Sequence, residues 1–212
     1  MEEQVEIQID GIELPGTLHI PDGAHGVVLF AHGSGSSRLS PRNNFVAGVV
    51  QQRGIATLLF DLLTPREDQN FTRRFDIPLL TERLVGATQW LQRREETQAL
   101  AIGYFGASTG SAAALNAAAR LAGTVRAVVS RGGRPDLAYR ALPEVQAPTL
   151  FIVGGDDGEV LDLNREAMKR LRAPHQLAVV PGATHLFEEP GALEEVARLA
   201  TDWFARYLMV AG

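Results

Sequence analysis

The stretch Gly106-Ala107-Ser108-Thr109-Gly110 decides the fold, because it separates an apolar run from an alanine-rich one. Residues 100–105 before it are typical of a buried strand, and residues 111–121 after it favour a helix. A serine on such a turn exposes its hydroxyl at the top of a sheet, and small flanking residues avoid a collision with neighbouring backbone. The helix that follows directs its amides and positive dipole end at the serine. The pattern predicts an activated Ser108, although Gly-x-Ser-x-Gly also occurs in ordinary glycine-rich loops.

Bulk composition indicates an ordinary globular chain of one domain, residues 1–212. The chain is 45% hydrophobic and 21% charged, and it carries a net charge of −5. The acidic balance argues against nucleic acid as a partner and gives no signal for a membrane surface. The sequence contains no cysteine, which excludes disulfides, thiolate metal sites and a cysteine nucleophile. Residues 1–6 do not resemble a secretory signal, and no apolar run is long enough to span a bilayer, so we expect a cytoplasmic location.

Strands and helices alternate through most of the sequence. Residues 5–20 predict an antiparallel hairpin at a sheet edge, with a turn at Asp10-Gly11 and a proline, Pro15, that an edge tolerates. The rest predicts an α/β fold: a doubly wound, mostly parallel sheet with helices on both faces. The predicted strands are Val27–Ala31, Ile55–Phe60, Leu100–Phe105, Val125–Ser130, Pro148–Val153 and Gln176–Val180. The other predicted helices are Asn43–Arg53, Ile77–Arg94, Leu161–Leu171 and Ala192–Met209.

An acid and a histidine follow late strands, after the serine in chain order. Asp156 and Asp157 follow one strand, and His185 follows the last. Serine, acid, histidine is the order in which alpha/beta-hydrolases present a triad, and parallel strands bring all three to one sheet edge. The imidazole would take the serine proton while a carboxylate orients the ring. His185 could instead be a surface histidine, and either aspartate could cap a helix or close a turn.

The oxyanion of such a reaction needs two backbone donors. The amide of Thr109 is one, and the loop His32-Gly33-Ser34-Gly35 after an early strand predicts the second. We expect the amide of Ser34 in this role, with Gly35 next, and His32 as a residue that ties the loop down. The alternative is a flexible glycine-serine loop without a catalytic role.

Four segments together resemble the alpha/beta-hydrolases of the dienelactone hydrolase-like group. These are His32 to Gly35, Gly106 to Gly110, Gly154 to Val160 and Gly182 to His185, and the resemblance covers nearly the whole chain. It implies that Asp157, in the pattern Gly-x-x-Asp-x-x-Val, is the acid. Dienelactone hydrolase proper uses a cysteine nucleophile, which this chain lacks, so the resemblance implies a serine enzyme more like the esterase, thioesterase and acyl-peptidase relatives.

The surroundings predict an open cleft without a large cap domain. Residues 131–147 are too few for a helical lid, and the charged loop 62–76 is the other candidate wall. Arg131 and Arg38 lie near the predicted site and could hold an anionic substrate group, or else pair with acids such as Asp61 and Asp136.

The predicted function is hydrolysis of a small ester or thioester, with no metal and no organic cofactor. A non-catalytic binding protein on the same fold is the main alternative. Nucleotide binding is disfavoured because neither a Gly-x-Gly-x-x-Gly turn nor a Gly-Lys-Ser/Thr sequence is present. The hairpin and the terminal helix are candidate surfaces of a homodimer. Ester, thioester, lactone and amide substrates all remain open.

Overall fold

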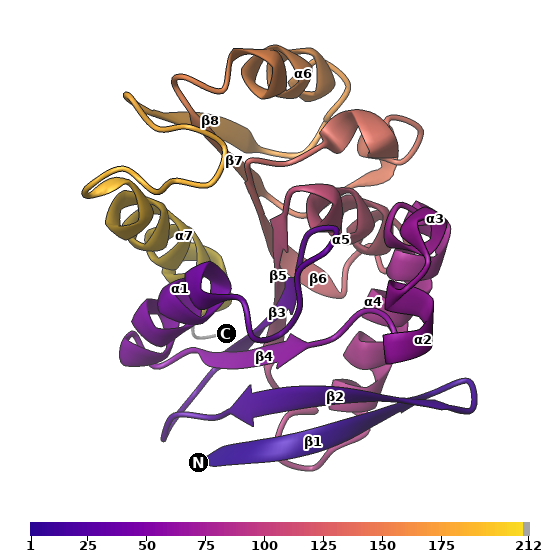
Figure 1. Cartoon of the computed structure of the whole chain (residues 1–212). Coiled ribbons are helices and arrows are strands. Elements are labelled where there is room, and N and C mark those ends of the chain that lie inside the picture. Colours follow the sequence, from indigo (N-terminus) through magenta and orange to yellow (C-terminus); the bar gives the residue numbers. More distant parts are fainter. Residues whose placement is uncertain (210–212) are drawn as a thin grey trace.

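Eight strands form one sheet in a computed structural model that describes residues 1–209 (Figure 1). The strand order is β1-β2-β4-β3-β5-β6-β7-β8, and β3 to β8 are parallel. The predicted mostly parallel α/β sheet with an antiparallel N-terminal hairpin is therefore confirmed. The strands are β1 (Glu2–Ile9), β2 (Ile12–His19), β3 (Gly26–Ala31), β4 (Ala56–Phe60), β5 (Ala101–Ala107), β6 (Val125–Arg131), β7 (Thr149–Gly154) and β8 (His175–Val180).

Helices cover both faces of the sheet, each over its own apolar core. On one face α1 packs beside α7, and on the other α4 packs beside α5, with α6 on that same side (Figure 1). Strand residues of β3 to β7 are buried almost throughout, as expected for strands covered on both faces. The helices are α1 (Pro41–Gln52), α2 (Pro65–Asp68), α3 (Phe71–Arg74), α4 (Ile77–Gln92), α5 (Thr109–Arg120), α6 (Gly158–Met168) and α7 (Ala192–Leu208), with 3₁₀ turns η1 (Pro135–Ala138) and η2 (Leu142–Glu144).

The N-terminal hairpin lies at the sheet edge, but Pro15 does not lie in the edge strand as predicted. It sits in β2, which pairs with β1 on one side and with β4 on the other. The hydrogen-bond ladder between β2 and β4 covers only residues 16–19 of β2, so Pro15 lies just beyond its end. The missing N–H of the proline therefore costs this ladder no hydrogen bond. Its carbonyl still accepts a hydrogen bond of 3.1 Å from the Asp61 amide.

The segment 62–76, predicted as an irregular loop, contains two short helices. A capping box between Thr64 and Glu67 starts α2, and the Asn70 side chain caps α3. Glu67 also receives two hydrogen bonds from Arg83 of α4, at 2.8 and 2.9 Å. These local caps and the ion pair order the segment, which we call the rim segment.

The sheet topology places a crevice between β3 and β5. From β3 the chain passes to α1 on one face, and from β5 it passes to α5 on the opposite face. Such a switch point, at the carboxyl ends of parallel strands, is where ligands bind in open α/β sheets. Within residues 1–209 no helix has the length and apolar character needed to cross a membrane.

Candidate active site

Ser108 adopts a strained backbone conformation between β5 and α5. Its φ of 52° and ψ of −121° lie outside the regions that a non-glycine residue ordinarily occupies. A Cβ on Gly106 would come 2.5 Å from the Cα of Ser111, and one on Gly110 would come 2.1 Å from the carbonyl oxygen of Ala31. Both glycines are therefore required for α5 to pack directly against the sheet. The sharp strand-to-helix turn that the sequence predicts at Ser108 is present, and we call residues 106–110 the elbow.

Ser111 holds the elbow from behind, a role that the sequence analysis missed. Its hydroxyl donates a 2.7 Å hydrogen bond to the carbonyl oxygen of Ser108 and accepts one of 2.9 Å from the Arg134 amide. The Arg134 amide also lies 3.2 Å from the Ser108 carbonyl oxygen. Ser111 is fully buried, so these bonds are shielded from water. Its position three residues after Ser108 was the available signal, because a serine there can reach back to a helix's first turn.

The carboxylate of Asp157 orients the ring of His185. Asp157 Oδ2 lies 2.7 Å from His185 Nδ1, while Asp156 is exposed to solvent. Asp157 stands at the N-terminal cap of α6, yet its side chain makes no capping bond there. The carboxylate therefore faces the histidine and not its own helix. Between the two aspartates, the geometry favours the residue that the resemblance implied.

The His185 ring lies beside the elbow. A Cβ on Gly132 would come 3.3 Å from His185 Cε1, and the Ser108 amide donates to the carbonyl of Arg131, the residue before Gly132. Within residues 1–209 no hydrogen bond links Ser108 Oγ to the imidazole. Such contacts commonly tighten only when substrate binds. The His185 side chain is 38% exposed, so the site is accessible from solvent.

The loop after β3 is tied down by His32, as predicted. Nε2 of this ring accepts a 3.0 Å hydrogen bond from the Leu62 amide, which leaves Nδ1 to donate to the Gly33 carbonyl at 2.9 Å. Burial lowers the pKa of His32, in keeping with a neutral ring that has both nitrogens satisfied. His32 therefore links the loop to the rim segment and is unavailable as a base.

The amide of Ser34 is directed at the elbow. It donates a 2.9 Å hydrogen bond to Oγ1 of Thr109, the residue after Ser108. A Cβ on Gly33 would lie 3.2 Å from the Cβ of Ser108, so only a glycine allows this approach without displacement. Gly35 has a φ of 73° and faces Arg74 of the rim segment. The loop is therefore placed against the elbow by specific contacts, in contrast to a flexible glycine-serine loop.

The two candidate substrate-binding arginines differ. Arg38 pairs with Asp61, both through its guanidinium at 2.9 Å and through its backbone amide at 2.8 Å. This is the alternative that the sequence left open for it, so we remove Arg38 from the candidate anion site. Arg131 is buried, and no ion pair or hydrogen bond joins its guanidinium to another residue of the described chain. Asp136 pairs with Arg134 instead.

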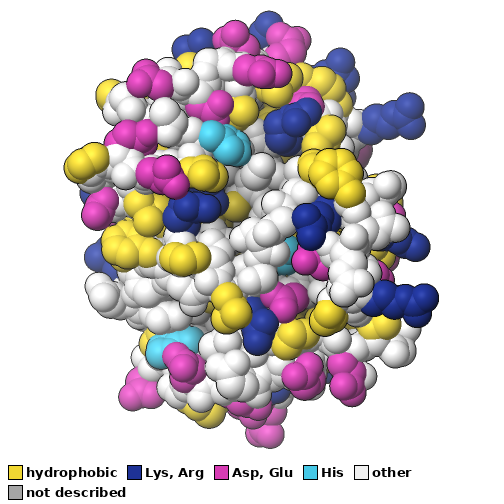
Figure 2. Space-filling view, viewed as in Figure 1, with side chains coloured by type: hydrophobic (Ala, Val, Ile, Leu, Met, Phe, Trp, Pro, Cys, Tyr) yellow, Lys and Arg dark blue, Asp and Glu magenta, His cyan; other side chains and the backbone are white. Residues whose placement is uncertain are grey.

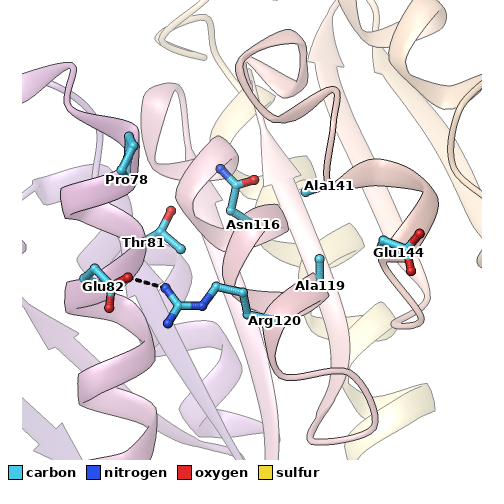
Figure 3. Close-up of a pocket in the computed structure, with 8 residues that line it drawn as sticks. All are labelled: Pro78, Thr81, Glu82, Asn116, Ala119, Arg120, Ala141 and Glu144. Carbon is cyan, nitrogen blue, oxygen red and sulfur yellow. Dashed lines mark hydrogen bonds and ion pairs between the residues drawn. The ribbon is translucent and has the colours of Figure 1, made fainter.

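A hollow of about 430 Å³ lies away from this site, between α4, α5 and the 3₁₀ turn η2 (Figure 3). An ion pair between Glu82 and Arg120 bridges its two helices. A smaller hollow of about 280 Å³ adjoins the loop after β3 and the rim segment, and its lining includes His32, Arg38 and Asp61. The face shown in Figure 2 mixes acidic, basic and hydrophobic side chains. Within residues 1–209 no cluster of three or more His, Asp or Glu side chains could hold a metal ion.

Comparison with known proteins identifies the family to which the chain belongs. Residues 47–209 match the dienelactone hydrolase family. A dienelactone hydrolase of known crystal structure from Anabaena variabilis is 58% identical, with 98% of each chain covered and a TM-score of 0.96. Est1E from Butyrivibrio proteoclasticus is 15% identical, with a TM-score of 0.83 over 96% of this chain and 98% of that one, which shows a shared fold alone.

Two proteins from Mycobacterium tuberculosis, strains CDC 1551 and H37Rv, are each 56% identical over 211 residues and bear the name "Putative phosphoribosyl transferase". The match covers 100% of this chain but 48% of each relative, so the chain spans about half the length of the curated relatives it matches. The family match covers well over half of the chain, and the Anabaena protein matches it over 98% of both chains. The chain belongs to the dienelactone hydrolase family.

Proposed function

We propose that this chain is a serine hydrolase that cleaves carboxylic esters or thioesters of small acyl groups. Family membership points to a hydrolase. The single observation that carries the finer proposal is the 2.7 Å hydrogen bond from His185 to Asp157 beside a serine on a strained strand-to-helix turn. A carboxylate, an imidazole and a serine hydroxyl are the groups that acyl transfer requires.

The first half of the reaction forms an acyl-enzyme. Ser108 Oγ attacks the substrate carbonyl carbon as His185 Nε2 takes the hydroxyl proton, which gives a tetrahedral intermediate and an imidazolium. Asp157, bound to Nδ1, fixes the tautomer and stabilises the charged ring. When the intermediate collapses, the bond to the leaving group breaks and His185 returns the proton to the departing oxygen or sulfur. In the second half His185 activates water, which releases the acid and restores Ser108.

The negative charge on the carbonyl oxygen needs backbone donors. We assign the amide of Thr109, at the first turn of α5, and the amide of Ser34, which already points at residue 109. Because Ser34 now donates to the Thr109 hydroxyl, substrate has to displace that hydroxyl oxygen with its own carbonyl oxygen. The threonine thus keeps the donor oriented in the free enzyme.

A binding protein without catalysis is the alternative that the fold alone permits. Two observations favour catalysis over binding alone. The serine lies on a strained turn that only its flanking glycines allow, and the Asp157 carboxylate makes no capping bond to its own helix. The name of the mycobacterial relatives describes chains about twice as long, and no contact in residues 1–209 points to phosphoribosyl transfer.

The test is turnover of 4-nitrophenyl acetate, 4-nitrophenyl butyrate and acetyl thiocholine by wild type and Ser108→Ala. We expect wild type to hydrolyse at least one of them, with loss of roughly 10⁴-fold or more in kcat for Ser108→Ala. Circular dichroism of both proteins is the control that checks whether they are equally folded. A Ser108→Ala protein that retains wild-type turnover would refute the proposal.

A further inference from the structure

Arg131, the last residue of β6, is a buried cation without a partner. The residue is 6% exposed, and its guanidinium carbon lies 5.7 Å from the ring centre of Phe187. Within residues 1–209 no carboxylate forms an ion pair with Arg131, whereas Arg38, Arg83 and Arg134 each pair with an acid. A buried charge is costly unless it is paired, so this arrangement calls for an anion from outside the chain.

A second arginine contributes to the same positive field. Burial lowers the pKa of Arg131 to about 10, with a smaller contribution from the charge of Arg42, which lies in the first turn of α1; Arg131 is therefore protonated at neutral pH. The Nε atom of Arg42 is buried and has no hydrogen-bond partner. In the part of the chain that the structure describes, its one ion pair is a loose one of 3.8 Å with Glu188, whose side chain is 68% exposed. The first turn of α1 contains no acid to offset the helix dipole.

Both arginines adjoin the candidate catalytic residues. The carbonyl oxygen of Arg131 accepts a 3.1 Å hydrogen bond from the Ser108 amide. Phe187, on which its guanidinium rests, follows His185 by two residues, and Glu188 follows it by three. An anion bound between the arginines would therefore lie on the same side of the sheet as the histidine loop and next to the nucleophile.

We propose that Arg131 and Arg42 together bind an oxyanion group, a carboxylate or a phosphate, carried by the substrate whose acyl bond Ser108 attacks. The proposal rests on the proposed function for its link to catalysis, but the binding site itself does not require turnover. Guanidinium groups match both oxyanions with paired N–H donors. An anionic ligand can replace Glu188 as the partner of Arg42, because an ion pair so exposed to solvent is weak.

The kinetic test compares mono-4-nitrophenyl adipate, which carries a free carboxylate, with 4-nitrophenyl methyl adipate, in which a neutral methyl ester replaces that carboxylate. A second neutral substrate, 4-nitrophenyl acetate, carries neither the carboxylate nor the methyl ester. We expect wild type to favour the anionic ester in kcat/KM. Arg131→Met and Arg42→Met should each lower the ratio of anionic to neutral kcat/KM by roughly 10-fold to 100-fold, since each removes charge-assisted hydrogen bonds. The control Arg198→Met removes the same charge from an exposed position on α7 and should leave the ratio unchanged.

A binding test separates this inference from the proposed function. Isothermal titration of Ser108→Ala with adipate and with inorganic phosphate should show binding of at least one of them. The anion that binds shows whether the site takes a carboxylate or a phosphate. In the double variant Ser108→Ala with Arg131→Met, the binding signal should vanish. Thermal unfolding is the third readout: a structural arginine would make Arg131→Met less stable, whereas an unpaired ligand-binding cation predicts equal or higher stability. Binding that survives Arg131→Met, or no binding and no preference for the anionic ester in a folded protein, would overturn the inference.

Discussion

The elbow and the rim segment meet at the same crevice but are held by different forces. At the elbow, backbone packs on backbone: the places where Gly106 and Gly110 would carry a Cβ are already occupied by main-chain atoms. In the rim segment, caps and ion pairs at partly exposed side chains supply the order, with Phe71 and Phe75 largely outside the core. Steric constraints of the first kind cannot relax, whereas charge pairs of the second kind are screened by water and salt. We therefore expect substitutions at the elbow to cost far more than those at the rim.

After Ser108→Ala, the largest effect is expected from the residue that contacts the candidate base, His185. Asp157→Asn keeps the shape but removes the charge that stabilises the imidazolium, and it should lower kcat by roughly 10³-fold to 10⁴-fold. Steady-state hydrolysis of the best ester measures it. Asp156→Asn is the matched control, because that side chain is exposed, and it should stay within about twofold of wild type. Equal losses in the two variants would remove Asp157 from its assigned role.

Gly110→Ala tests the steric half of the comparison. A methyl group 2.1 Å from the Ala31 carbonyl oxygen forces α5 away from β3, and we expect a loss of about 3 kcal/mol or more in the free energy of unfolding. Urea denaturation followed by circular dichroism gives this value. Gly48→Ala, on α1 with nothing within 4 Å of the added Cβ, is the control and should be neutral or stabilising. A Gly110→Ala protein as stable as wild type would contradict the packing described.

Ser111→Ala tests the hydrogen bonds behind the elbow. It removes the hydroxyl that bridges the Ser108 carbonyl and the Arg134 amide, and it should cost about 1 to 3 kcal/mol of stability. Because Ser108 loses an anchor, kcat should fall while KM changes little. Ser111→Thr restores the hydroxyl but adds a methyl group beside Gly133, so it should recover only part of the loss. Unaltered stability and kcat in Ser111→Ala would show that the clamp is dispensable.

The smallest effect belongs to the rim. Arg83 lowers the pKa of Glu67 from 4.5 to about 2, so the ion pair stabilises the folded protein fully above about pH 4.5. That contribution should decline as the pH falls toward 2, where the folded carboxylate also takes up a proton. After allowance for solvent screening we expect about 1 kcal/mol, seen as a smaller acid-induced loss in Glu67→Gln than in wild type. Parallel stability curves for the two proteins between pH 5 and pH 2.5 would show that the pair contributes nothing.

The same contrast explains what could be predicted from the sequence. The sheet, its helices and the elbow follow from apolar runs and from glycines that sterics demand, and the predicted ends lie within a few residues of those observed. The sequence left the choice between an anion and Asp61 as the partner of Arg38 open, and it did not predict the order of the rim segment, because both depend on contacts with side chains distant in sequence, such as Asp61 and Arg83. Three expectations stay predictions: the single domain over residues 1–212, the cytoplasmic location and the homodimer. Residues 210–212 lie outside the described range.

The most direct test of the central claim is intact-mass labelling with a fluorophosphonate. Ser108 with an oriented His185 should react once per chain, and the added mass should vanish in Ser108→Ala and persist in Ser111→Ala, whose nucleophile is intact. The same single adduct in Ser108→Ala, or none on folded wild type, would contradict a catalytic serine at the elbow.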